Sequence, residues 1–267
     1  MKRIALSLLS IAIAGSVAIN AEKYRIPVGE FNELVLNDKL NVVYSNNPDS
    51  VGFVAFETKP AYAAYIMTEN QKSRLKIQLD QEADGITELP TVYVYSSFLS
   101  KVENGREGNI LIKSVKPTSK ITIESQGNGK IEARNLDAVS ISLKIKTGKG
   151  TIIASGKCKS LECLNIGAGV IEADEIEATD ADCRLVGTGT IGCAPTKTLK
   201  IKGMGSGKIY YKGNPSIEKS GITTVKTIKL DEAETEVTES AGAEVEVEEI
   251  TPEEKVSPRS SRKTVTI

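Results

Sequence analysis

The sequence predicts an all-β protein, a single-stranded right-handed parallel β-helix (solenoid) in which each coil of strands stacks on the next. The motif Gly-x-Gly-x-Ile occurs five times, and the first glycines of successive copies lie 21, 19, 20 and 18 residues apart. Apolar and polar residues alternate around each copy, and no helix-length apolar pattern separates the copies. A repeat of about 20 residues with this alternation is typical of a solenoid of stacked strands.

The five motif copies predict the corners and the apolar core of the coils. The chain must turn within about three residues at each copy, where a positive φ or a close backbone approach excludes a Cβ atom. With coils stacked about 4.8 Å apart, the isoleucines form an internal ladder. The expected structural residues are Gly127, Gly129, Ile131, Gly148, Gly150, Ile152, Gly167, Gly169, Ile171, Gly187, Gly189, Ile191, Gly205, Gly207 and Ile209.

Each corner is flanked by two predicted strands. Six and four residues before the first glycine the chain is apolar and the residue between is polar, as in Leu199-Lys200-Ile201. This period of two indicates a strand with one buried face. After the corner a second short strand begins at the isoleucine, and a polar connection is expected to follow it. Parallel strands need a crossover, and right-handed crossovers dominate.

The period loosens at both ends of the domain. Residues 24–110 hold β-branched and aromatic runs separated by Asn, Pro, Asp and Gly, which predicts irregular coils that cap the N-terminal end. Gly105, Gly108 and Ile110 form a degenerate copy, because Ile110 lies 21 residues before Ile131. At the other end, Gly213 and Pro215 break the period before a final strand.

Composition divides the chain into three parts. Residues 1–21 combine two basic residues, an apolar stretch and small residues, which predicts a signal peptide; an uncleaved membrane anchor is the alternative. Residues 22–230 form the β-helix domain. Residues 231–254 carry eleven acids and no base, so we expect 231–267 to be a disordered acidic low-complexity tail. The chain is therefore expected to be exported, to the periplasm, the medium or the cell surface.

Charge restricts the partners. Residues 22–230 carry 28 Lys and Arg against 24 Asp and Glu, a balance of +4, which is too small to indicate nucleic acid. Once the signal is cleaved, no integral membrane segment is expected. The partners that stay open are an envelope protein, a surface glycan and a second copy of the chain.

Residue types argue against catalysis. The chain has no His, which removes the commonest general base and metal ligand, so no catalytic, metal or cofactor-binding residue and no cofactor is predicted. The best carboxylate pair is Glu162 and Asp182, at equivalent outward positions on successive coils. Two carboxylates so placed could flank a glycosidic bond or hold Ca²⁺. The alternative is a solvated charge column, partly neutralised by Lys200 and Arg184.

Cysteines and lysines supply two further candidates. Cys163 and Cys183 occupy the same repeat position on adjacent coils, which is compatible with a disulfide in an oxidising compartment and equally with a buried thiol ladder. No Cys-x-x-Cys spacing indicates zinc. A basic face for acidic glycans is the second candidate, and ordinary solvated lysine is its alternative. The lysines concerned are Lys130, Lys144, Lys146, Lys149, Lys157 and Lys159.

Three segments carry a family resemblance. They are Phe31-Asn-Glu-Leu-Val-Leu36 with Leu40-Asn-Val42, the Gly-x-Gly-x-Ile copies, and the closing Ile209-Tyr-Tyr-Lys-Gly-Asn-Pro-Ser-Ile217 followed by Gly221. Over about residues 26–230 the chain resembles the putative auto-transporter adhesin, head GIN domain family of secreted bacterial proteins, common in Bacteroidetes. The resemblance implies a right-handed β-helix and adhesion, and it brings no catalytic residues.

The sequence thus favours a non-enzymatic exported β-helix that serves as an adhesin or binding scaffold of the bacterial envelope or surface. Two alternatives stay open: a polysaccharide-acting β-helix enzyme, by fold analogy alone, and a periplasmic structural or assembly module.

Overall fold

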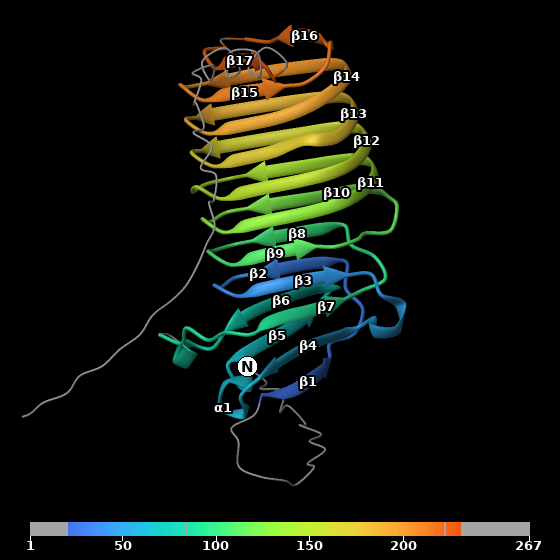
Figure 1. Cartoon of the computed structure of the whole chain (residues 1–267), viewed down its shortest axis with the longest axis vertical. Coiled ribbons are helices and arrows are strands. Elements are labelled where there is room, and N and C mark those ends of the chain that lie inside the picture. Colours follow the sequence, from blue (N-terminus) through green and yellow to red (C-terminus); the bar gives the residue numbers. More distant parts are fainter. Residues whose placement is uncertain (1–20, 84, 222, 231–267) are drawn as a thin grey trace, which may run out of the picture. The chain divides into compact units, whose positions relative to one another are not determined.

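The structure is a computed structural model that describes residues 21–83, 85–221 and 223–230. These residues form a right-handed β-solenoid of about six turns, as the repeat predicts (Figure 1). The predicted signal peptide, apart from Ala21, and the predicted acidic tail lie outside the described residues. No helix within these ranges is long and apolar enough to cross a membrane.

Most of the described chain lies in strands, which belong to one hydrogen-bonded sheet system. Three short helical turns, η1 (Pro48–Ser50), α1 (Pro60–Ala63) and η2 (Gln81–Ala83), lie between N-terminal strands. The strands are β1 (Glu22–Pro27), β2 (Glu33–Leu36), β3 (Asn41–Ser45), β4 (Phe53–Thr58), β5 (Ile66–Gln71), β6 (Arg74–Leu79), β7 (Thr91–Tyr95), β8 (Lys101–Asn104), β9 (Asn109–Ile112), β10 (Thr118–Ser125), β11 (Lys130–Ile145), β12 (Thr151–Gly167), β13 (Val170–Gly187), β14 (Thr190–Met204), β15 (Lys208–Tyr211), β16 (Ser216–Lys219) and β17 (Lys226–Lys229).

The regular coils come from the long strands β11 to β14. Each begins after a Gly-x-Gly corner, runs along one wall, curves round the far edge and returns along a second wall to the next corner (Figure 1). We call the walls formed by the strand beginnings and strand ends wall 1 and wall 2. Strands β9 and β15 continue wall 1, and β8, β10 and β16 continue wall 2. All these neighbours are parallel.

The polar connection expected after the second short strand is instead a bend within one continuous strand. In β11 the register with β12 shifts between Ala133 and Leu136, and Asn135 has a φ of +55°. In β12, Gly156 pairs with Leu136, the residue after Asn135, and has a φ of +139°. These left-handed conformations turn the chain without ending the strand, because the hydrogen-bonded pairing resumes directly after them.

The interior of wall 1 is the isoleucine ladder that the motif predicts. Every rung pairs with the next in register, and each side chain is at most 1% exposed. Burying one such side chain contributes roughly 1.5–3 kcal/mol. The rungs are Ile110, Ile131, Ile152, Ile171, Ile191 and Ile209.

The two glycines of a corner are needed for different reasons. Gly187 has a φ of +123°, which L side chains rarely adopt. Gly189 lacks room instead: a Cβ atom there would lie 2.5 Å from the carbonyl oxygen of Gly169 on the preceding coil and 2.5 Å from the side-chain nitrogen of Asn165. Successive corners therefore stack backbone on backbone.

A buried asparagine supports this corner from inside. The Nδ2 of Asn165 donates to the carbonyl oxygens of Gly169, at 2.7 Å, and Thr190, at 3.2 Å. Asn104 makes the same bond to Gly108, at 2.5 Å, in the degenerate copy. Both side chains are fully buried, and each adds a second hydrogen bond to a corner carbonyl that also accepts from a backbone amide of the next coil.

The N-terminal cap departs from sequential stacking. Strand β2 lies between β6 and β8, and β3 lies between β7 and β9. Strands β2 and β3 thus form one coil. The next segment, β4 to β7, lies on the side of this coil that faces the N-terminal end of the solenoid. The chain then crosses to the other side of the coil, where β8 and β9 continue the solenoid. The pairs β1–β4, β4–β7 and β5–β6 are antiparallel. The predicted irregular cap is present, and its antiparallel strands cover the end of the solenoid.

At the C-terminal end, β15 and β17 extend wall 1 and β16 extends wall 2. Gly213, with a φ of +83°, turns the chain between β15 and β16, and Pro215 directly precedes β16. All four residues of β16 are exposed.

Replacing Ile171 by Asp tests the ladder. A carboxylate at this fully buried rung has no partner, so we expect a loss of about 4 kcal/mol or more in the free energy of unfolding. Chemical denaturation followed by circular dichroism measures it. The matched control is Val139→Asp, because Val139 is 59% exposed and its replacement should change stability little. Equal stability of the two variants would contradict the register.

Candidate contact surface

The outward side chains of wall 2 line up in columns, because its strands are paired in register. Two neighbouring columns hold nearly all the charges of this wall. The first runs Lys101, Thr122, Ser142, Glu162, Asp182, Lys200 and Glu218. The second runs Glu103, Glu124, Lys144, Leu164, Arg184 and Lys202.

Glu124 is the centre of the N-terminal part of this surface. Glu124 is 6% exposed, and its carboxylate lies 3.0 Å from Lys146 Nζ and 3.2 Å from Lys101 Nζ. Lys101 also contacts Glu103, which binds Arg74 of β6. The charges therefore form one network from β6 through β8 and β10 to Lys146, which directly follows β11.

Burial and the neighbouring charges shift the pKa values of this network in opposite directions. Burial alone would raise the pKa of Glu124, but hydrogen bonds from Lys146 and Lys101 outweigh burial and hold that pKa below its ordinary value. Burial would likewise lower the pKa of Lys101, while Glu124 and Glu103 raise it above the ordinary value. Both groups are thus held in their charged forms.

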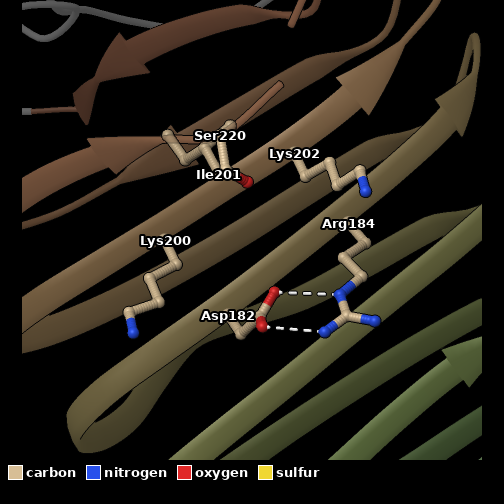
Figure 2. Close-up of a pocket in the computed structure, with 6 residues that line it drawn as sticks. All are labelled: Asp182, Arg184, Lys200, Ile201, Lys202 and Ser220. Carbon is tan, nitrogen blue, oxygen red and sulfur yellow. Dashed lines mark hydrogen bonds and ion pairs between the residues drawn. The ribbon is translucent and has the colours of Figure 1, made fainter. Parts of the chain in front are cut away.

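The C-terminal part of the surface contains a shallow hollow of about 230 Å³. Arg184 donates two hydrogen bonds to the carboxylate of Asp182, one from Nε at 3.2 Å and one from a terminal nitrogen at 3.0 Å (Figure 2). Lys200 lies beside Asp182 and Lys202 beside Arg184 on the next strand (Figure 2). The hollow thus has three bases and one acid, and that acid is already paired with one of them.

The structure brings the predicted carboxylates Glu162 and Asp182 to paired positions on adjacent strands. Each is engaged by its own neighbours. Glu162 accepts a hydrogen bond from the Ser142 hydroxyl, at 2.9 Å, and lies 3.7 Å from Lys144 Nζ, while Asp182 is held by Arg184. Within the described ranges no group of three or more Cys, Asp or Glu is arranged to hold a metal ion. This arrangement is the charge column that the sequence leaves open as the alternative.

The lysines predicted as one basic face lie on different faces, so that prediction is wrong. Lys144 and Lys146 are on wall 2 and Lys149 is at a corner. Lys130 opens wall 1, where it pairs with Glu132 at 3.1 Å, and Lys157 lies past the far bend, 3.3 Å from Asp137. Residues close in sequence are separated because each coil passes through two walls and two edges.

The four cysteines are buried and free. Cys163 and Cys183 occupy paired positions, as predicted, and Cys193 from wall 1 brings its Sγ to 3.7 Å from that of Cys183. A hydrogen bond with Cys163 and burial raise the pKa of Cys183. Burial raises the pKa of Cys158 to about 11. Cys163 and Cys183 are thus stacked as the thiol ladder requires, and a disulfide between them stays an expectation.

Sequence reasoning missed Glu124 and the buried asparagines. Glu124 looks like any outward acid of an alternating strand. Its burial depends on lysines from coils on either side, which only the register reveals. Asn165 did have a local signal, because it is a polar residue at an inward position four residues before the second glycine of a corner.

Together these features define a class: a β-solenoid whose chemistry lies on its outer walls and edges. The family described as putative auto-transporter adhesin, head GIN domain, matches residues 30–215, and the chain belongs to this family. No curated protein matches the chain.

Several solved structures share the fold. A protein from Bacteroides fragilis described as a putative adhesin is 23% identical, with a TM-score of 0.72, over 79% of this chain and 97% of that one. One from Parabacteroides distasonis, described as a putative lipid binding protein, is 21% identical with a TM-score of 0.64, over 79% and 96%. A putative adhesin from Parabacteroides merdae is 17% identical with a TM-score of 0.57, over 79% and 96%. At these identities the likeness shows the fold alone.

Replacing Glu124 by Gln tests the charge network. The folded pKa of Glu124 is depressed, so its ionised form contributes stability above the ordinary pKa of 4.5, and this contribution is lost as the pH falls through the folded value. We expect Glu124→Gln to lower stability by about 1–3 kcal/mol at neutral pH. The difference from wild type should shrink below pH 4.5.

Urea unfolding at several pH values measures this difference. The matched control is Glu162→Gln, because the side chain of Glu162 is 37% exposed and should contribute little. A wild-type advantage that stays constant into acid would contradict the assignment to ionised Glu124.

The cysteines give a further prediction. Because all four thiols are buried and burial raises the pKa of Cys158, they should react with a thiol reagent only after unfolding. Titration in denaturant without reductant should then give four thiols per chain. A result of two would show a bridge, and peptide mapping would identify it.

Proposed function

We propose that the chain is an exported, non-catalytic binding module that serves adhesion at the bacterial envelope or surface through the outside of its solenoid. The observation that carries this proposal is the in-register array of outward side chains, which a rigid stacked backbone holds at fixed spacing. Such an array presents many weak contacts at once, and linked contacts gain affinity from their number. A repeated ligand would suit a repeated surface.

The contacts of the carboxylates support binding over catalysis. Glu162 is engaged by the Ser142 hydroxyl and by Lys144, and Asp182 is engaged by Arg184, so neither carboxylate is left open toward a substrate. The hollow beside them is shallow and open rather than enclosed. A polysaccharide-acting enzyme on this wall is therefore the less favoured alternative.

The family description and the predicted signal peptide agree with this proposal. The family name refers to an adhesin, and the first 21 residues carry the signal-peptide pattern. The description of the Parabacteroides distasonis protein adds lipids to the ligand classes that deserve a test. A second copy of the chain and an envelope protein stay among the partners that we consider.

The proposal predicts binding without turnover. The purified chain should bind one of three immobilised classes: whole bacterial surfaces, glycans, or lipid vesicles. It should release no new reducing ends from a panel of acidic and neutral polysaccharides. Reducing-end release by the wild type that Glu162→Gln with Asp182→Asn abolishes would instead establish an enzyme. Absence of binding to all three classes would remove the adhesion proposal.

A further inference from the structure

The edge that carries the Gly-x-Gly corners differs in composition from both walls. We call it the glycine edge and define it as residues 126–130, 146–151, 166–170, 186–190 and 204–208. It is the side of tight turns at the left of the coils in Figure 1. Successive corners stack backbone on backbone, and several of the other side chains in these segments are exposed.

Three of these side chains are large, apolar and in register. Ile166 pairs with Val186, and Val186 pairs with Met204, on three consecutive coils. They are 42%, 46% and 60% exposed. Scattered exposed apolar residues are ordinary, whereas a contiguous apolar row bordered by polar residues is a candidate interaction site. The small residue Ala168 and the half-buried Val170 extend the row towards wall 1.

The charges of the glycine edge have one sign. Its five segments contain no Asp or Glu, and they contain Lys130, Lys146, Lys149 and Lys208. Lys130 and Lys146 bind acids of the adjoining walls. Lys149 and Lys208 are exposed, and no ion pair joins either one to an acid of the described chain. Lys149 thus lies on the corner that precedes the apolar row, and Lys208 lies on the last corner of the row, the one that begins with Met204.

This combination selects one kind of occupant. A phospholipid surface offers anionic phosphates directly above an apolar layer, and proteins bind such a surface with exposed apolar side chains bordered by Lys and Arg. An acidic glycan would match the lysines but would leave the apolar row in water. The glycine edge is free of acids, so it offers no anionic group to the Lys and Arg side chains of a protein partner.

We propose that the glycine edge docks on an anionic phospholipid surface. Ile166, Val186 and Met204 enter the headgroup layer, and Lys149 and Lys208 face lipid phosphates. The inference rests on the proposed function, because it names the ligand class and the contact residues of that binding module. It assigns the contact to an edge of the solenoid, beside the columns of wall 2.

Vesicle flotation tests this assignment. The protein is produced from its full sequence. An apolar leader that is not removed would itself bind lipid, so intact mass spectrometry must show that every variant has the same N-terminus. The probes are vesicles of phosphatidylcholine alone and of phosphatidylcholine mixed with phosphatidylglycerol. We expect binding to the anionic vesicles only, weakened by added salt.

Two sets of substitutions separate the two parts of the site. Lys149→Gln with Lys208→Gln should weaken binding roughly 30-fold. Ile166→Thr, Val186→Thr and Met204→Thr together should weaken it at least roughly tenfold, since threonine keeps strand preference while removing apolar surface. The matched control on the opposite edge is Val139→Thr with Lys159→Gln and Lys197→Gln, which removes exposed residues of the same types. It should bind like wild type.

Each outcome decides the inference. Loss of binding in both sets, with unchanged thermal unfolding and an unaffected control, supports it. Equal binding by all variants, or an equal loss in the control, overturns the assignment to this edge. Absence of vesicle binding together with retained binding to glycans or cells overturns the lipid inference and leaves the proposed function intact. Sensitivity to the lysine set alone, with the same sensitivity for acidic polysaccharides, assigns the edge to an anionic glycan instead.

Discussion

The contact on which the rest of the structure depends is the stacking of one glycine corner on the next. At Gly189 a Cβ atom would meet a backbone carbonyl of the previous coil, so the coils can approach to hydrogen-bonding distance only where the side chain is absent. The bond from the amide of Gly189 to the carbonyl of Gly167, at 3.0 Å, closes this contact. The corner thereby sets the vertical position of every coil, and both walls inherit the register from it.

Register then acts on the two sides of each wall in different ways. Inside, it superimposes isoleucine on isoleucine, and the close packing of the core tolerates little variation. On the outer face, the register places side chains of neighbouring coils next to one another, so that they interact although each is in contact with solvent. Glu124 is held in its charged form only because lysines of coils on both sides fall beside it, and Arg184 meets Asp182 along one strand. The same constraint thus produces a uniform core and a varied outer surface.

The sequence predicted the parts of the fold that depend on local period. The isoleucine ladder and the paired positions of Cys163 and Cys183 follow from counting along one chain. The insertion of β2 between β6 and β8 does not, because this pairing joins segments some 40 residues apart with no shared motif. The single lysine face failed because proximity in sequence is not proximity in a coil with two walls. Glu124 was missed because its environment comes from three coils at once.

The corner also explains why the chemistry of the molecule lies at its periphery. A solenoid with a filled core has no interior space for a ligand, and the stacked glycines keep its edge low. Ile166 and Met204, which project from that edge, are 42% and 60% exposed and therefore leave much apolar surface in contact with water. The first two motif copies carry Gln126 and Thr147 at the equivalent position before the first glycine, which shows that the position accepts polar residues. An apolar row here is therefore not a requirement of the fold, and the proposed docking on a lipid surface would account for it.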